Sequence, residues 1–301
     1  MSVGAVFPGQ GAQSVGMLAE LAEQYPSVVQ KFAQASDLLG FDVWKMVQEG
    51  PAEDLSATQN TQPILLTASV AIWDVWQSHA PAPGYVAGHS LGEYSALTCA
   101  GALDFADAVR LVRLRGELME AAVPRGQGAM AAIMGLSDDE VIACCEATNG
   151  VVVAANFNAP GQVVIAGAAA AVQTAADACK TAGAKRAVML DVSGPFHSPL
   201  MASAKAEFAQ ALGGIDLQMP AMAIVQNVSA DIPTSVEQLR DNLLAQIAEP
   251  VLWSRSVNRM VQGGVDHFFE CGPGNVLAGL IRRISKATPT TALAMPQAHA
   301  G

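Results

Sequence analysis

Residues 88–92, GHSLG, place one serine between two glycines at the spacing G-x-S-x-G. This spacing is typical of a serine on a sharp turn from a strand into a helix, where small residues let the two elements approach each other. The turn exposes the serine hydroxyl and leaves the amide of Leu91 at a helix N-terminus, where it can donate to an oxyanion. A bare motif of this kind also occurs by chance. The short apolar stretch before it and the helical pattern after it favour Ser90 as a nucleophile.

A serine nucleophile needs a base, and the chain has five histidines. Three have surroundings that indicate a surface position or the start of a strand: His79, His299 and His267. His89 adjoins the serine, but neighbours on a sharp turn point in different directions. His197 lies in the stretch GPFHSPLM, between Pro195 and Pro199. Loops held rigid by their scaffold often carry catalytic groups, so His197 is the preferred candidate, with an ordinary packed histidine as the alternative.

One arginine interrupts an apolar helix face. The pattern of residues 104–122 predicts a long amphipathic helix, with this apolar stripe: Ala108, Leu111, Val112, Leu118, Met119 and Ala122. Arg115 falls in the middle of the stripe, whereas Arg110 and Arg113 fall away from it. A buried charge is costly unless it is paired, so the partner is either a protein carboxylate or a ligand. The guanidinium fork suits a carboxylate, which together with serine chemistry suggests an acyl group bearing a free carboxylate.

The elements around these residues alternate between strand and helix, which indicates a mainly parallel sheet. Apolar runs predict strands at 3–7 and 85–87, and the Gly-rich loop PGQGAQ follows the first of them. Helices are predicted at 63–76, where proline suits the first turn, and at 91–100. The pattern returns near the C-terminus with helices at 199–212, at 236–247 and from 276, and with strands at 223–227 and 267–270. The tail at 288–301 is expected to be mobile.

Between residues 129 and 192 the order changes to βαββαβ, the split βαβ unit of ferredoxin-like domains. The stretches VPRGQG and SGP are plausible linkers on either side. We therefore predict a small subdomain at 125–193, inserted into a larger α/β domain formed by 1–124 and 194–301.

Composition excludes several function classes. The net charge of −11 argues against tight binding to nucleic acid, and no apolar run approaches the roughly 18 residues that span a membrane. The N-terminus lacks the pattern of a secretory signal, and the five cysteines form no CxxC pair. No cluster has the spacing of metal ligands. We expect a cytoplasmic, metal-free monomer with free thiols.

Nine motifs follow one another in a specific order: FPGQGAQ, TQPILLTASVA, AGHSLGEYSAL, RGELM, GAMAAI, NFNAPGQVVIAG, GPFHSPLM, QIAEPVLW and CGPGNVL. Over residues 3–285 the chain resembles the malonyl-CoA:acyl-carrier-protein transacylases of bacterial fatty-acid synthesis. The resemblance implies an α/β-hydrolase-like parallel-sheet core with an inserted ferredoxin-like subdomain. It also implies ping-pong transfer of a malonyl group from malonyl-CoA to the phosphopantetheine thiol of acyl-carrier protein. Coenzyme A enters as a thioester substrate, and no bound cofactor is implied.

The resemblance implies the following roles. Ser90 would be the acylated nucleophile and His197 its base, and the amides of Gln10 and Leu91 would form the oxyanion hole. Arg115 would hold the malonyl carboxylate. Further residues on the substrate side would be Gln246, Phe196, Met119, His89 and Asn156, with Asn158 beside them in the cleft.

Two of these residues have a more specific role by the same resemblance. The backbone carbonyl of Gln246 would orient the imidazole where a hydrolase uses an acid. The ring of Phe196 would crowd a substituent on the acyl α-carbon.

The partner and the reaction leave alternatives open. Acyl-carrier proteins are usually acidic, as this chain is, so docking needs a basic rim. The candidates are Lys185, Arg186, Arg282, Arg283 and Lys286; solvated helix ends explain them equally well.

A serine hydrolase is the nearest rival function, and it predicts an acid partner for His197 and no buried arginine in the acyl pocket. Two further alternatives are a transferase of a polyketide or malonate-decarboxylase pathway and a scaffold without catalytic activity.

Overall fold

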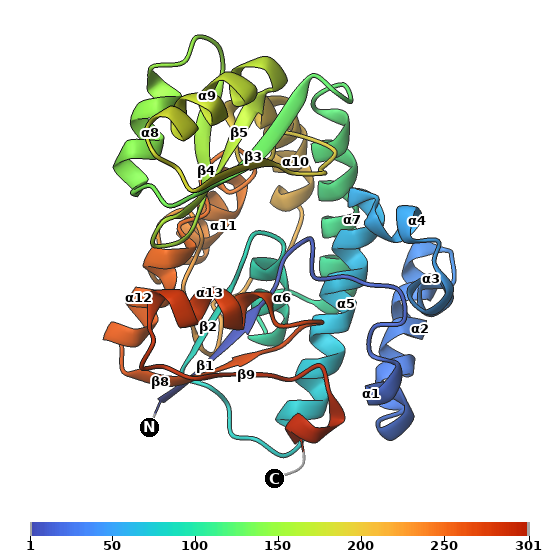
Figure 1. The fold of residues 1–301 in the computed structure, drawn as a ribbon. Coiled ribbons are helices and arrows are strands. Elements are labelled where there is room, and N and C mark those ends of the chain that lie inside the picture. The colour runs from blue at the N-terminus through green and yellow to red at the C-terminus, as the bar shows by residue number, and fades with distance from the viewer. Residues whose placement is uncertain (1, 300–301) are drawn as a thin grey trace.

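The computed structural model describes residues 2–299 and contains two separate sheets (Figure 1). The larger one is parallel throughout, in the order β7-β2-β1-β8-β9. Its strands are β1 (Ser2–Phe7), β2 (Tyr85–Gly88), β7 (Ala223–Ile224), β8 (Val265–Glu270) and β9 (Thr290–Ala292). On β1, Ala5 and Phe7 belong to one buried cluster and Val6 to another. Both faces of the sheet are therefore covered, as apolar parallel strands require.

Helices supply the two covering layers. The larger cluster contains buried residues of α2 (Ser27–Leu39), α5 (Thr58–Gln77), α6 (Gly92–Cys99), α7 (Phe105–Ala121), α10 (Ala202–Gly213) and α11 (Val236–Ala245). The opposite cluster contains those of α12 (Trp253–Gln262) and α13 (Val276–Ile284). Shorter elements complete the chain: α1 (Ala19–Gln24), α3 (Val43–Glu49), α4 (Ala52–Ser56), η1 (Pro199–Met201) and η2 (Pro296–His299). Among the helices of residues 2–299, none combines the length and the apolar character that crossing a membrane demands.

The small sheet is antiparallel, in the order β4-β5-β3-β6. Its elements are β3 (Gly128–Met134), α8 (Asp138–Glu146), β4 (Val152–Ala159), β5 (Gln162–Ala168), α9 (Ala169–Thr181) and β6 (Arg186–Met189). They enclose a hydrophobic cluster of their own. The α/β fold class and the βαββαβ order are thus confirmed. The limits 1–124, 125–193 and 194–301 stay a prediction.

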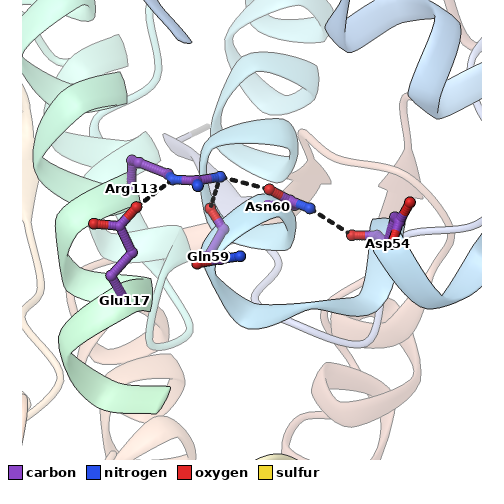
Figure 2. Close-up of polar contacts among 5 residues, drawn as sticks. All are labelled: Asp54, Gln59, Asn60, Arg113 and Glu117. Atoms are coloured by element: carbon purple, nitrogen blue, oxygen red, sulfur yellow. Dashed lines mark hydrogen bonds and ion pairs between the residues drawn. The ribbon is translucent and has the colours of Figure 1, made fainter. Parts of the chain in front are cut away.

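Helix α5 begins at Thr58, five residues before the predicted start, so Pro63 lies inside it. A proline there removes the amide that would bond the carbonyl of Gln59. Figure 2 shows how this carbonyl is satisfied: Arg113 Nη1 donates to it at 3.3 Å. Arg113 also donates to the Asn60 side chain, and its Nε donates to Glu117 Oε1 at 2.6 Å. A contact from the neighbouring helix α7 thus replaces the lost bond, a tertiary effect that local propensity does not report.

We expect Arg113→Met to lower the free energy of unfolding by about 1.5–3 kcal/mol, the usual range for hydrogen bonds to charged groups. Methionine keeps the apolar stem but leaves the Gln59 carbonyl without its donor. Urea titration measures the change, and Arg110→Met, on the solvent side of the same helix, is the control. Equal unfolding free energies for the two variants would show that water satisfies the carbonyl instead.

The C-terminal segment differs from the expected mobile tail over its described part, 288–299. Strand β9 pairs with β8, and the amide of Leu293, whose side chain is fully buried, donates to the carbonyl of Glu270 at 3.0 Å. His299, predicted at the surface, is buried, and its ring bonds the carbonyl of Leu293 at 2.8 Å. The edge of β8 offers a row of free backbone groups, and their pairing orders the segment.

Glu270 ends β8 and caps the following helix. Its carboxylate accepts from the amides of Leu277 and Ala278, at 2.9 and 2.8 Å, in the first turn of α13. A negative charge at a helix N-terminus is favourable, which accounts for this buried acid as a structural residue.

Candidate active site

Ser90 lies on the turn from β2 into α6, with a backbone φ of 51°. This left-handed conformation is unfavourable for a serine, and close packing holds it. A Cβ on Gly88 would lie 1.8 Å from the carbonyl carbon of Gly92, and a Cβ on Gly92 would lie 2.0 Å from the oxygen of Phe7. Asn227 clamps the turn, because its Oδ1 accepts from the Ser90 amide at 2.7 Å and its Nδ2 donates to Gly88. The glycine spacing therefore serves the strand-to-helix approach.

The structure brings Ser90 and His197 together across more than a hundred residues of sequence. The distance from Ser90 Oγ to His197 Nε2 is 2.7 Å, and from His197 Nδ1 to the backbone oxygen of Gln246 it is also 2.7 Å. Because a carbonyl only accepts, Nδ1 carries the proton and Nε2 presents its lone pair to the serine. His197 also has a left-handed φ of 57°.

The histidine is neutral in the free protein. Burial lowers the pKa of His197 to about 3, and the nearby Arg115 guanidinium contributes to the same shift. Its Nε2 is therefore unprotonated and ready to take the serine proton over the whole neutral range.

Arg115 faces inward and is only 1% exposed. Its Nη1 donates to Gln62 Oε1 at 2.8 Å, and its Nη2 donates to Gln246 Oε1 at 3.0 Å and to Ser90 Oγ at 3.2 Å. The guanidinium also lies 5.3 Å from the centroid of the Tyr94 ring. Within residues 2–299 it has no ion pair with a carboxylate, and its Nε has no hydrogen-bond partner. A buried cation that can still bind a carboxylate thus lies against the serine hydroxyl.

Leu91 and Gln10 are the two residues predicted to supply the amides of an oxyanion hole. Leu91 is the N-cap residue of α6, and Gln10 lies in the loop after β1. Neither amide donates a hydrogen bond to any part of the chain that the structure describes. The Gln10 side chain is held by a contact of 3.3 Å from Nε2 to Thr58 Oγ1.

The other predicted residues differ in what they contact. His89 does not contact the serine hydroxyl; its Nε2 lies 2.7 Å from Asn158 Oδ1 on β4, which ties the large sheet to the small one. Three side chains are largely buried: Met119 at 2% exposure, Asn156 at 6% and Phe196 at 8%.

Gln246 differs from the predicted substrate contact. Its side chain is fully buried and forms hydrogen bonds with Arg115, with the Ser90 carbonyl and with Glu93.

Four polar residues of this site were not predicted from the sequence: Gln62, Glu93, Gln226 and Asn227. All four are buried. Gln62 and Glu93 stand in otherwise apolar helical stretches, which is the signal that could have identified them. Gln226 and Asn227 were predicted as the end of a strand, but β7 ends at Ile224 and the Asn227 amide donates to Glu93 Oε2 at 3.0 Å.

Comparison with known proteins agrees with this geometry. The family model described as acyl transferase domain matches residues 5–297. A malonyl CoA-acyl carrier protein transacylase of Escherichia coli O157:H7 is 54% identical over 298 residues, which cover 98% of this chain and 96% of that protein. The Bacillus subtilis protein of the same name is 43% identical, with 97% and 93% coverage.

Solved structures give the same result. An acyl carrier protein S-malonyltransferase from Vibrio cholerae is 50% identical, with a TM-score of 0.95 over 97% of this chain and 96% of that one. A malonyl-transacylase in complex with a type II polyketide acyl-carrier protein is 49% identical, with a TM-score of 0.98 over 100% and 98%. This chain is therefore an acyltransferase and belongs to the family of malonyl CoA-acyl carrier protein transacylases.

Proposed function

We propose that the protein moves a malonyl group from malonyl-CoA to the phosphopantetheine thiol of acyl-carrier protein through an ester on Ser90. One observation carries the proposal: the buried guanidinium of Arg115 lies 3.2 Å from Ser90 Oγ, and within residues 2–299 it has no ion pair with a carboxylate. An acyl group attached to that oxygen can place a terminal carboxylate against the guanidinium. The printed names of the relatives point to the same substrate and the same acceptor.

In the first half-reaction, His197 Nε2 takes the hydroxyl proton while Ser90 Oγ attacks the thioester carbonyl carbon. The amides of Leu91 and Gln10 donate to the developing oxyanion. The intermediate collapses when the C–S bond breaks, and coenzyme A leaves as a thiol with the proton from His197. A malonyl ester remains on Ser90.

The second half-reaction runs in the opposite direction with a new thiol. His197 removes the proton of the phosphopantetheine thiol, the sulfur attacks the ester carbonyl, and the C–O bond to Ser90 breaks. The proton returns to the serine oxygen. Substrate thioester and product thioester are nearly equal in energy, so the same groups serve both directions.

The contacts of His197 favour transfer over the hydrolase alternative. A hydrolase would pair the imidazole with an acid, whereas here Nδ1 meets the backbone oxygen of Gln246. A hydrolase would also lack the buried arginine beside the serine.

The test is an intact mass after incubation with malonyl-CoA, and separately with acetyl-CoA, in the absence of carrier protein. We expect a lasting malonyl adduct on the protein and little acetyl adduct. Steady release of coenzyme A without an adduct would mean that water is the acceptor and that the protein is a hydrolase.

We also propose where the carrier protein docks. Lys185, Arg186 and Arg283 line one open cavity of about 660 Å³, between the small sheet and α13. Arg282 and Lys286 line a neighbouring cavity of about 380 Å³. All five side chains are exposed. The two cavities form a basic face on a chain of net charge −11, which suits an acidic partner.

Charge reversal tests this docking surface. We expect Arg282→Glu/Arg283→Glu to raise the apparent KM for acyl-carrier protein by about tenfold or more, because a rim charge mainly affects association. The rate of Ser90 acylation by malonyl-CoA should stay unchanged. Lys45→Glu/Arg110→Glu makes the same change in net charge on α3 and α7 and is the control. An unchanged KM in the first variant would exclude this surface as the dock.

Fatty-acid synthesis is the proposed pathway and the cytoplasm the proposed compartment. The polyketide complex among the similar structures keeps the polyketide carrier as the second candidate acceptor. Comparing the two carrier proteins as acceptors of one malonyl-enzyme preparation separates them. The monomeric state remains a prediction.

A further inference from the structure

Glu93 is a buried carboxylate that the proposed mechanism does not use. It lies in the first turn of α6, three residues after the nucleophile, and is 0% exposed. Its Oε1 accepts from Gln226 Nε2 at 3.0 Å. Its Oε2 accepts from the Asn227 amide at 3.0 Å and from Gln246 Nε2 at 2.8 Å. A charged group at this depth needs a reason, since an apolar residue would cost less to bury.

Two of these partners hold the nucleophile and the base. Asn227 Oδ1 accepts from the Ser90 amide at 2.7 Å, and Gln246 Nε2 donates to the Ser90 carbonyl at 2.9 Å. Both backbone groups of the strained serine are therefore fixed by residues that Glu93 fixes. The backbone oxygen of Gln246 also accepts from His197 Nδ1 at 2.7 Å.

The same glutamine holds the arginine. Gln246 Oε1 accepts from Arg115 Nη2 at 3.0 Å, while Gln246 Nε2 donates to the carboxylate of Glu93. The orientation of the amide is thereby set: if it flipped, Nε2 would face the guanidinium and Oε1 would face the carboxylate. One negative charge fixes which end of Gln246 meets Arg115.

We propose that Glu93 is a positioning residue whose negative charge, acting through Gln246 and Asn227, holds Ser90, His197 and Arg115 in their reactive arrangement. The inference rests on the proposed function of Ser90 and adds a residue to it. In this arrangement the acid does not touch the imidazole. It lies one residue further from the imidazole than the acid of a hydrolase would. Gln246 transmits its effect to Arg115 through the side-chain amide and to His197 through the backbone oxygen.

The contacts favour the ionised form of Glu93, because all three neighbours present N–H donors and none is an acceptor for a carboxyl proton. The charged and titratable groups that face it are Arg115 from α7, Tyr94 on its own helix and His197 beyond Gln246; Gln226, Asn227 and Gln246 are neutral. Burial raises the pKa of Glu93 to about 7, against the opposing effect of the three donors and of Arg115. The charge is therefore present above pH 7 and lost as the pH falls through that value.

The experiment measures single-turnover acylation of the full chain by malonyl-CoA, and separately its inactivation by a serine-directed sulfonyl fluoride. Glu93→Gln keeps the shape and removes the charge. We expect both rates to fall by about 10–100-fold, since small displacements of reacting groups cost this much. A defect limited to binding of the malonyl carboxylate would slow acylation by malonyl-CoA and leave the rate of inactivation by the sulfonyl fluoride unchanged.

The pH dependence separates positioning from simple structural support. In the unmodified protein the sulfonylation rate should decline below about pH 7, and Glu93→Gln should lose this decline. Gln226→Met removes one donor from the carboxylate and should move the decline to higher pH by about one unit. This variant is the milder one and keeps the test available if Glu93→Gln does not fold.

Glu270→Gln is the matched control, since it neutralises another buried acid that accepts two backbone amides and shares no hydrogen-bond partner with Glu93. We expect it to lower stability without changing either rate. Unchanged rates in folded Glu93→Gln, or a pH decline that neither variant alters, would overturn the inference. Failure of the unmodified protein to form any malonyl adduct would instead contradict the proposed function.

Discussion

Ser90→Ala is expected to gain no mass on incubation with malonyl-CoA and to transfer malonyl groups about 10⁴-fold more slowly or worse. In the proposed mechanism the acyl group becomes attached to the hydroxyl oxygen, and no other described nucleophile lies against His197 Nε2. Intact mass of the enzyme and a carrier-protein acylation assay measure the two effects. The fold should survive, because alanine removes only an oxygen and keeps the backbone bonds to Asn227 and Gln246.

His197→Ala is the companion variant. Serine and histidine act as one unit in the proposed mechanism, so we expect the double variant to be no slower than the worse single one. Multiplied losses in the double variant would indicate that the two residues act independently. A malonyl adduct that persists in Ser90→Ala would place the nucleophile elsewhere.

Arg115→Ala is expected to slow acylation by malonyl-CoA by a factor of about 30 to several thousand, and to speed acylation by acetyl-CoA. The loss follows from the roughly 2–5 kcal/mol that a buried charge contact contributes. Acylation rates with each thioester, measured by single-turnover mass spectrometry, give the ratio of the two substrates directly.

The gain with acetyl-CoA has an electrostatic cause. After burial, Arg115 is the next largest cause of the low pKa of His197, so removing the cation makes the imidazole a stronger base. In the proposed complex with malonyl-CoA, the substrate carboxylate would neutralise the same cation and have a similar effect. Acetyl-CoA has no carboxylate, so in the unmodified protein the base stays weak with this substrate.

The control is Arg110→Ala, an arginine of the same helix that faces solvent and pairs with Asp107. It should leave both rates unchanged. Equal losses on malonyl-CoA and acetyl-CoA in Arg115→Ala would assign Arg115 a structural role and reopen the choice of substrate.

Features that depend on neighbouring residues could be predicted from the sequence. The spacing of Gly88, Ser90 and Gly92 predicts the turn, because strand and helix must pass within contact distance there. The 3.6-residue period predicts that Arg115 faces inward, and the structure leaves it 1% exposed. The alternation of elements likewise indicates the α/β class and the βαββαβ insertion.

Element boundaries depended on contacts that local patterns do not report. Arg113 lets α5 extend through Pro63, and the edge of β8 orders the segment after residue 288. Helix α12 was missed, although Trp253, Ser256, Val257 and Met260 recur at helical spacing and are buried.

The hydrogen bonds that hold the site together could not be predicted from local sequence. Glu93, Gln62 and Asn227 come from separate parts of the chain, and each looks like an ordinary polar residue in its own segment. Their hydrogen bonds form because the fold buries them side by side, where each donor and acceptor must find a partner within the protein. Burial and pairing depend on contacts between residues distant in sequence, so this network and the charge at its centre follow from the folded chain as a whole.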